Sequence, residues 1–112
     1  AHADNPDACE FSRLACTVLA GMPDSSPVQR RLMALDAAML AKRAMDTHPQ
    51  DAGVADAACR VLEYLSRCTG NRRDLISLGV VGTVMRAEVD HSAAAGGLRA
   101  LVDRTLHHLV PN

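Results

Sequence analysis

Apolar residues recur along this chain in stripes that fit one face of a helix. The clearest stripe has the spacing i, i+3, i+4, i+7, i+8 and i+11 and comprises Val54, Ala57, Ala58, Val61, Leu62 and Leu65. Residues at this spacing share one side of a helix with 3.6 residues per turn. The pattern predicts a long amphipathic helix over residues 51–67.

The same stripe occurs twice more, 43 residues earlier and 44 residues later. The earlier copy comprises Phe11, Leu14, Ala15, Val18, Leu19 and Met22. The later copy comprises Leu98, Leu101, Val102, Thr105, Leu106 and Leu109. We therefore predict two further long helices, at 7–22 and 94–109.

The segments between the stripes repeat at the same interval. VQRRLMALD and NRRDLISLG align at an offset of 43 and end near Asp36 and Gly79, where a helix stop or turn is expected. AAMLAKRAMDTH and VVGTVMRAEVDH follow them. Four shorter helices are predicted at 28–35, 37–47, 71–78 and 80–90. Because a fixed interval indicates a repeated structural unit, we expect about seven helices in three related units.

Composition favours the all-α class. Hydrophobic residues make up 48% of the 112 residues, but aromatic residues only 2%, namely Phe11 and Tyr64. A core of Leu, Ala, Val and Met suits closely packed helices better than a β-sandwich, which draws on β-branched and aromatic residues. The length is that of a single domain, 1–112.

The repeat unit resembles the armadillo repeat, with HEAT repeats as the near neighbour. In NRRDLISLGVVGTVMRA the family's Asn, Ile, Gly and following apolar positions are matched by Asn71, Ile76, Gly79, Val80, Val81 and Val84. In VADAACRVLEYLSR, Ala58, Leu62 and Leu65 occupy the Ala and Leu positions of the family's third helix. The resemblance implies a right-handed α-solenoid of three-helix repeats that binds other proteins.

In this register the chain divides into an isolated third helix, 6–23, and two full repeats, 27–68 and 69–110. Solenoid repeats bury their apolar faces against neighbours, so the ends of an array need polar caps. No capping helix is evident for Phe11 and Leu14 at one end, or for Leu106, Leu109 and Val110 at the other. We expect either a piece of a longer array or a protein that stacks on itself.

Charge and hydropathy limit the partners. The formal net charge is -1, whereas non-specific binding of nucleic acid or anionic membranes requires clustered Lys and Arg. No apolar run approaches the ~18 residues of a membrane span, and the opening AHADNPDACE does not resemble a signal peptide. We expect neither nucleic-acid binding nor membrane insertion.

The four cysteines are expected to be free thiols. On a helix, Cys9 and Cys16 would be ~10 Å apart and Cys59 and Cys68 ~13 Å apart, since each residue adds ~1.5 Å. A disulfide requires Cα atoms within ~7 Å. Free thiols favour a reducing compartment, and we expect a cytoplasmic location.

No set of residues points to catalysis or to a cofactor. Cys16 and Cys59 occupy equivalent positions beside the apolar stripe and are interpreted as core residues, and only Cys68, near Arg67 and Arg72, has surroundings that could favour a thiolate. His48 and His91 are expected to cap second helices. His107 and His108 point about 100° apart on a helix and do not form a zinc site. We expect no enzyme activity, metal or cofactor.

The binding surface is expected on the third helices, which line the concave groove of armadillo proteins. The positions that carry Trp and Asn in the peptide-binding members hold Thr17, Arg60 and Arg104, and Gly21, Tyr64 and His108. This departure argues against a nuclear-localisation-type basic peptide. The predicted strip of Arg60, Tyr64, Arg67, Arg104 and His108 would instead accept an acidic or phosphorylated segment, because Arg makes bidentate contacts with such groups.

The leading functional hypothesis is a scaffold or adaptor that binds a protein partner along this strip. The first alternative is a self-assembly element that associates through its open ends. The second alternative, ranked last, is a thiol enzyme that uses Cys68.

Overall fold

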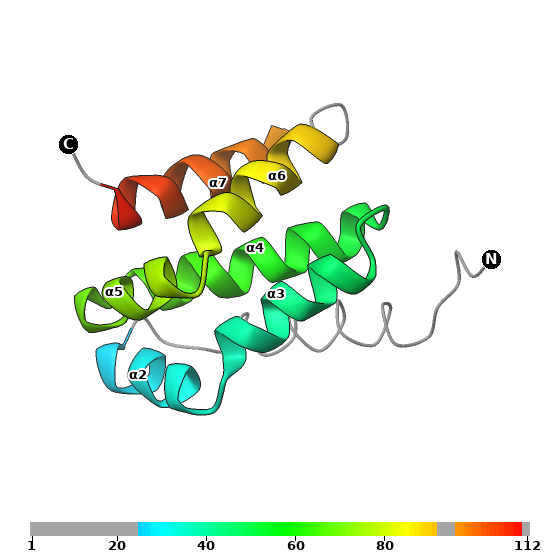
Figure 1. Ribbon diagram of the computed structural model, residues 1–112. Coiled ribbons are helices and arrows are strands. Elements are labelled where there is room, and N and C mark those ends of the chain that lie inside the picture. The colour runs from blue at the N-terminus through cyan, green and yellow to red at the C-terminus, as the bar shows by residue number, and fades with distance from the viewer. Residues whose placement is uncertain (1–24, 92–95, 111–112) are drawn as a thin grey trace.

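The computed structural model describes residues 25–91 and 96–110. Within these residues the chain is all helical (Figure 1). The helices are α2 (Ser26–Ala34), α3 (Ala37–Thr47), α4 (Ala52–Ser66), α5 (Thr69–Ser77), α6 (Val80–Asp90) and α7 (Gly96–Leu109).

Six of the seven predicted helices are confirmed, with ends within two residues of the predicted ones. The seventh, at 7–22, lies outside the described residues. Helix α2 begins before its predicted start because Pro27 fits the first turn, where a missing N–H is tolerated. Helix α5 begins earlier because Cys68 is its N-cap, so that Thr69 and Gly70 already belong to the helix.

The 43-residue repeat is confirmed in the helix boundaries. Adding 43 to the bounds of α2 and α3 gives those of α5 and α6, and adding 44 to α4 gives 96–110, against an observed Gly96–Leu109. The turns between first and second helices also match. Asp36 and Gly79 both have left-handed backbone, with φ of 64° and 82°. The left-handed turn therefore repeats at the same 43-residue interval as the sequence.

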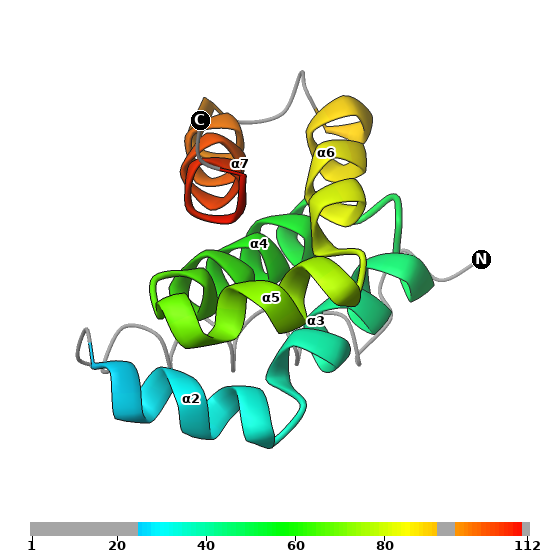
Figure 2. The same ribbon diagram turned by 60° about the vertical axis from the view of Figure 1, so that its left-hand side comes forward.

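Equivalent helices pack on one another. Helix α2 contacts α5, α3 contacts α6, and α4 contacts α7, and the last of these contacts is by far the most extensive. Figure 2 shows α7 beside α6, with α4 beneath both and α2 and α3 on the far side of α4. The described core is almost entirely aliphatic and is formed around Val54, Ala58, Leu62, Leu65, Leu75, Val80, Val84 and Val102.

Helix α4 is the central helix, with contacts to the other five described helices. Its predicted stripe is buried except for Val61, which is partly buried, and burial extends around the helix over five consecutive residues from Leu62 to Ser66. A helix enclosed on all sides has less surface to offer a partner than a helix at the edge. This arrangement limits the part of α4 that can belong to a binding groove.

Asn71 joins the two full repeats through polar contacts. Its buried amide nitrogen Nδ2 donates to the carbonyl oxygens of Gln29 at 3.2 Å and Leu65 at 3.0 Å. Its oxygen Oδ1 accepts from Nη1 of Arg30 at 3.2 Å, and the same Nη1 donates to the carbonyl of Gly70 at 2.8 Å. The Asn that carries part of the armadillo resemblance thus links α2, α4 and α5.

Candidate partner-binding site

The predicted strip lies on two helices that pack side by side, α4 and α7. Arg60 and Tyr64 lie on α4 and Arg67 is its C-cap, at spacings of four and three residues, and Arg104 and His108 are four apart on α7. Such spacings place side chains along one face of each helix. The structure brings Arg67 and His108 together at the α4–α7 contact through Glu63. It gives the other three residues different surroundings.

Arg60 is half exposed and already holds a carboxylate. Its Nε lies 2.8 Å from Oδ2 of Asp56, one turn earlier on α4. Both side chains reach solvent, and an exposed pair of this kind is weak, at about 0.3–0.5 kcal/mol. An acidic ligand could displace Asp56 at small cost.

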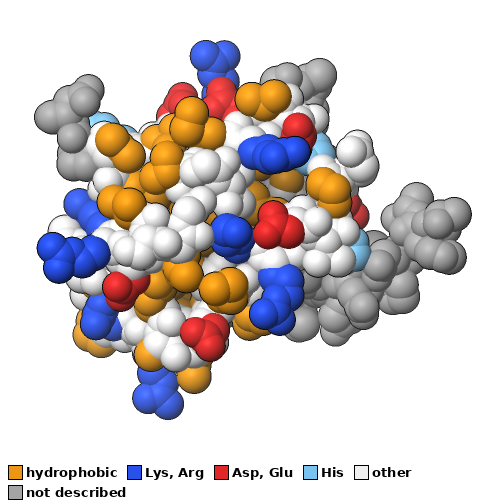
Figure 3. Space-filling view, in the orientation of Figure 1, with side chains coloured by type: hydrophobic (Ala, Val, Ile, Leu, Met, Phe, Trp, Pro, Cys, Tyr) orange, Lys and Arg blue, Asp and Glu red, His pale blue; other side chains and the backbone are white. Residues whose placement is uncertain are grey.

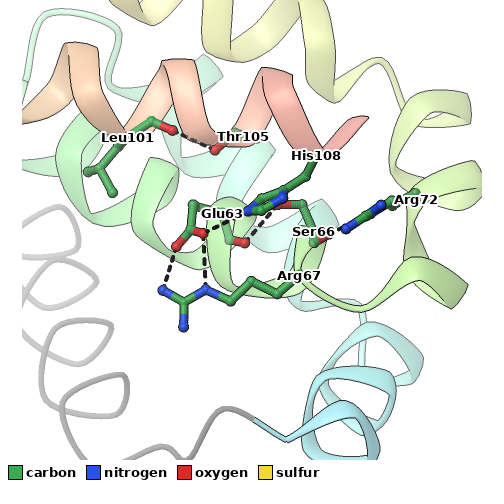
Figure 4. A network of polar contacts seen from close by, with 7 residues as sticks. All are labelled: Glu63, Ser66, Arg67, Arg72, Leu101, Thr105 and His108. Carbon is green, nitrogen blue, oxygen red and sulfur yellow. Dashed lines mark hydrogen bonds and ion pairs between the residues drawn. The ribbon is translucent and has the colours of Figure 1, made fainter. Parts of the chain in front are cut away.

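Glu63 is the centre of the strongest polar cluster in the described residues (Figure 4). Its side chain is 5% exposed, and its carboxylate accepts from Arg67 Nη2 at 2.8 Å and Arg67 Nε at 3.0 Å. His108 Nε2 from α7 lies 3.3 Å from the same carboxylate. Arg67 and His108 therefore converge on one internal acid.

These partners explain why a carboxylate is tolerated at a buried position. An isolated buried charge costs several kcal/mol, and paired contacts with hydrogen bonds offset that cost. When the proton of the His108 ring is on Nε2, this nitrogen donates to Glu63 and ties α7 to α4. His108 thus joins α7 to α4 at this contact, and Arg67 pairs with Glu63 at the C-terminal end of α4.

The remaining two residues contrast with each other. Tyr64 is buried, and the guanidinium of Arg67 lies over its ring, with Cζ 5.7 Å from the ring centroid. This distance fits a cation–π contact. Arg104 is exposed and makes no ion pair with the other described residues. Arg104 is therefore the cation in the strip most open to a ligand.

Glu63 is the site residue that the sequence reasoning did not weigh. The strip was counted as basic, although Glu63 lies between Arg60 and Arg67 in sequence. A signal was present, since Glu four residues before Arg is the favourable order for an ion pair on a helix. Burial of Glu63 and its contact with His108, 45 residues away, could not be predicted from that spacing.

Backbone caps add to the rigidity beside this cluster. Ser66 Oγ donates to the Glu63 carbonyl at 2.7 Å, and Arg72 Nε donates to the Ser66 carbonyl at 2.9 Å. On α7, Thr105 Oγ1 donates to the Leu101 carbonyl at 2.8 Å, which satisfies the one hydroxyl in the apolar stripe. The C-terminal end of α4 is thereby fixed by side chains from α4 and α5.

The described cysteines are both free and both buried. Cys59 lies in the core as predicted, and its burial, followed by the negative charge of Asp56, raises the pKa of its thiol to about 12. Cys68 is 6% exposed, so a substrate would reach its sulfur only if this part of the chain opened. Cys9 and Cys16 lie outside the described residues.

His48 and His91 are the C-caps of α3 and α6. The His91 ring makes a contact that capping alone does not predict, since its Nε2 lies 3.0 Å from the carbonyl oxygen of Pro49 in the preceding unit. Residues 25–91 and 96–110 contain no group of three His, Cys, Asp or Glu side chains able to hold a metal ion. None of their helices has both the length and the apolar character that a membrane crossing requires.

No protein-family model, curated protein or solved structure matches this chain.

Proposed function

We propose that this chain is a segment of an armadillo-like, right-handed α-solenoid that serves as a scaffold for a protein partner. The observation that carries the proposal is the recurrence of helix boundaries, left-handed turn and helix contacts at one interval. A solenoid is built when each unit packs on the next through equivalent helices. The pairing of α2 with α5, α3 with α6 and α4 with α7 supports this interpretation.

The proposed ligand is an acidic segment of a partner protein, bound across α4 and α7. Arg104 and Arg60 would make the first contacts because Arg104 is unpaired among the described residues and Arg60 is half exposed. Arg67 and His108 are committed to Glu63 and would border the site. Tyr64 supports Arg67 from beneath, through its ring.

A binding assay with a defined probe tests this proposal. The probe is a fluorescein-labelled peptide of Asp and Glu, compared by anisotropy with the matching Asn and Gln peptide. We expect the acidic peptide to bind more tightly and to weaken with salt. Changing Arg60 and Arg104 together to Glu is expected to lower affinity by about tenfold or more, corresponding to about 1.4 kcal/mol.

Two further variants sharpen the test. Asp56→Asn is expected to strengthen binding because it removes a negative charge 2.8 Å from Arg60 Nε. Arg73→Glu reverses one charge at an exposed position on α5, which is half the charge change of the double variant, and is expected to leave binding unchanged. Equal affinity for the two peptides, or an equal loss with Arg73→Glu, would refute the acidic-ligand proposal. Circular dichroism on each variant checks that the fold is retained.

A further inference from the structure

The exposed large apolar side chains of the described residues are not scattered. On the face drawn in Figure 3, apolar side chains gather over the region of α6 and α7 and, separately, over that of α2 and α3. Seven large apolar residues are exposed: Leu35, Met39, Leu40, Ile76, Met85, Val89 and Val110. Three lie in the hairpin formed by α2 and α3, and three lie in the hairpin formed by α5 and α6.

These two hairpins also contact each other inside the molecule. A cleft of about 630 Å³ lies between α3 and α6, with Lys42 and Asp46 on the α3 side and Gly82 and Thr83 on the α6 side. A second cleft of about 370 Å³ lies between α2 and α5 and includes Met33. Leu78 lines both clefts.

The repeat register relates the exposed residues to this internal contact. Adding 43 to Met33, Lys42 and Asp46 gives Ile76, Met85 and Val89. These three form what we call the trailing face, on the α5–α6 hairpin. The equivalent residues of the α2–α3 hairpin line the clefts between that hairpin and the α5–α6 hairpin.

The opposite shift works equally well. Subtracting 43 from Leu78, Gly82 and Thr83 gives Leu35, Met39 and Leu40. These three form the leading face, on the α2–α3 hairpin. The two exposed faces are therefore the two halves of one contact that the chain already makes internally.

The exposed faces are more apolar than the internal contact. Lys42 and Asp46 are replaced by Met85 and Val89 on the trailing face, and Gly82 and Thr83 are replaced by Met39 and Leu40 on the leading face. Val89 is 74% exposed. Burial of apolar surface is favourable in water, so covering these faces gives a larger hydrophobic stabilisation than the internal contact does.

Charge agrees with the same pairing. Arg86 and Met45 both line the internal cleft. Their equivalents in the two exposed faces are Arg43 on α3 and Glu88 on α6. When the leading face of one copy meets the trailing face of another, the register brings these opposite charges to the same cleft.

We propose that a second copy of this chain docks head to tail, with its α2–α3 hairpin against the α5–α6 hairpin of the first. This contact repeats the one between α3 and α6. It is heterologous, so each associated pair still has one leading and one trailing face open, and association continues with concentration. The proposal uses residues away from the acidic-ligand site and does not depend on it.

The test measures mass in solution by sedimentation velocity and light scattering over a range of concentrations. The wild-type chain is expected to exceed the monomer mass and to grow with concentration. The double variants Met85→Glu/Val89→Glu and Met39→Glu/Leu40→Glu each remove one face and are expected to be monomers alone. Ala100→Glu, at an exposed apolar position on α7 outside both faces, is the control and is expected to associate like the wild type.

Mixing the two double variants decides the geometry. Each retains the face that the other lacks, so an equimolar mixture is expected to give a one-to-one dimer that does not grow further. A wild-type chain that stays monomeric, or a mixture that does not pair, would overturn the proposal. If only one of the two double variants lost the ability to associate, the contact would be symmetric, and this result would also overturn the proposal. The single change Val89→Lys repeats the trailing-face test at the most exposed position.

Discussion

Asp36 and Gly79 lie 43 residues apart and adopt the same left-handed backbone, with φ of 64° and 82°. Each joins the first helix of a unit to the second, and the sharp turn lets α3 fold back beside α2 and α6 beside α5. A residue with a Cβ pays about 1–2 kcal/mol in this region, and Asp and Asn tolerate it best among them. The chain therefore uses two solutions to one geometric requirement.

Substitutions at two glycines are predicted to have opposite signs. Gly79→Ala should lower the free energy of unfolding by about 1–2 kcal/mol because of its positive φ. Gly82→Ala should raise it by about 1 kcal/mol, since Gly82 is inside α6 and a Cβ there would meet no atom within 4 Å. Urea unfolding followed by circular dichroism measures both. Gly79→Asp, which copies the other turn, should cost less than Gly79→Ala.

Asn71→Asp is predicted to destabilise the fold by about 2–4 kcal/mol, since a buried carboxylate cannot donate to the carbonyls of Gln29 and Leu65. Arg30→Met removes the donor to Oδ1 and to the Gly70 carbonyl from a largely exposed side chain but leaves both amide donors of Asn71 in place, and its cost should be smaller. Thermal and urea unfolding of the two variants rank these effects. If Arg30→Met cost as much as Asn71→Asp, the amide donors would not be the important contacts.

Arg67→Met is predicted to cost about 1–3 kcal/mol, because it leaves the buried Glu63 carboxylate with His108 alone. Adding Glu63→Gln to that variant should restore part of the loss, since the unpaired charge is then gone. A double-mutant cycle from urea unfolding gives the coupling energy of the pair. Additive costs would show that Arg67 acts through its contact with Tyr64 instead.

Stability is predicted to fall at alkaline pH in part through Cys59. The pKa of this thiol is about 12 in the folded chain, against 9.0 for an unperturbed thiol. Between these values the unfolded chain loses the proton and the folded chain keeps it, so rising pH favours unfolding by up to about 1.4 kcal/mol per pH unit. Urea unfolding from pH 8 to 11 should show a shallower decline for Cys59→Ala. Parallel declines would contradict the burial of this thiol.

The helix positions were predictable because their signals are local. The stripe from Val54 to Leu65 and the turn at Gly79 depend on neighbours within a few residues, and the confirmed helices lie where those signals place them. The interval of 43 residues then related α2 to α5 and α3 to α6 as equivalent helices. The contact between α4 and α7 was also predictable, because third helices were expected to be neighbours.

The sequence by itself determined which residues form helices, where they turn, and that the units are equivalent, since periodicity and backbone preference act over short distances. Only the tertiary structure decided that α4 is enclosed, that Glu63 draws Arg67 and His108 inward, and that the apolar residues of the two hairpins remain uncovered. These outcomes depend on which helices pack together. They also depend on the free-energy cost of removing water from a charge that becomes buried. Neighbours in space decide whether an arginine is exposed, as Arg104 is, or pairs with a buried acid, as Arg67 does.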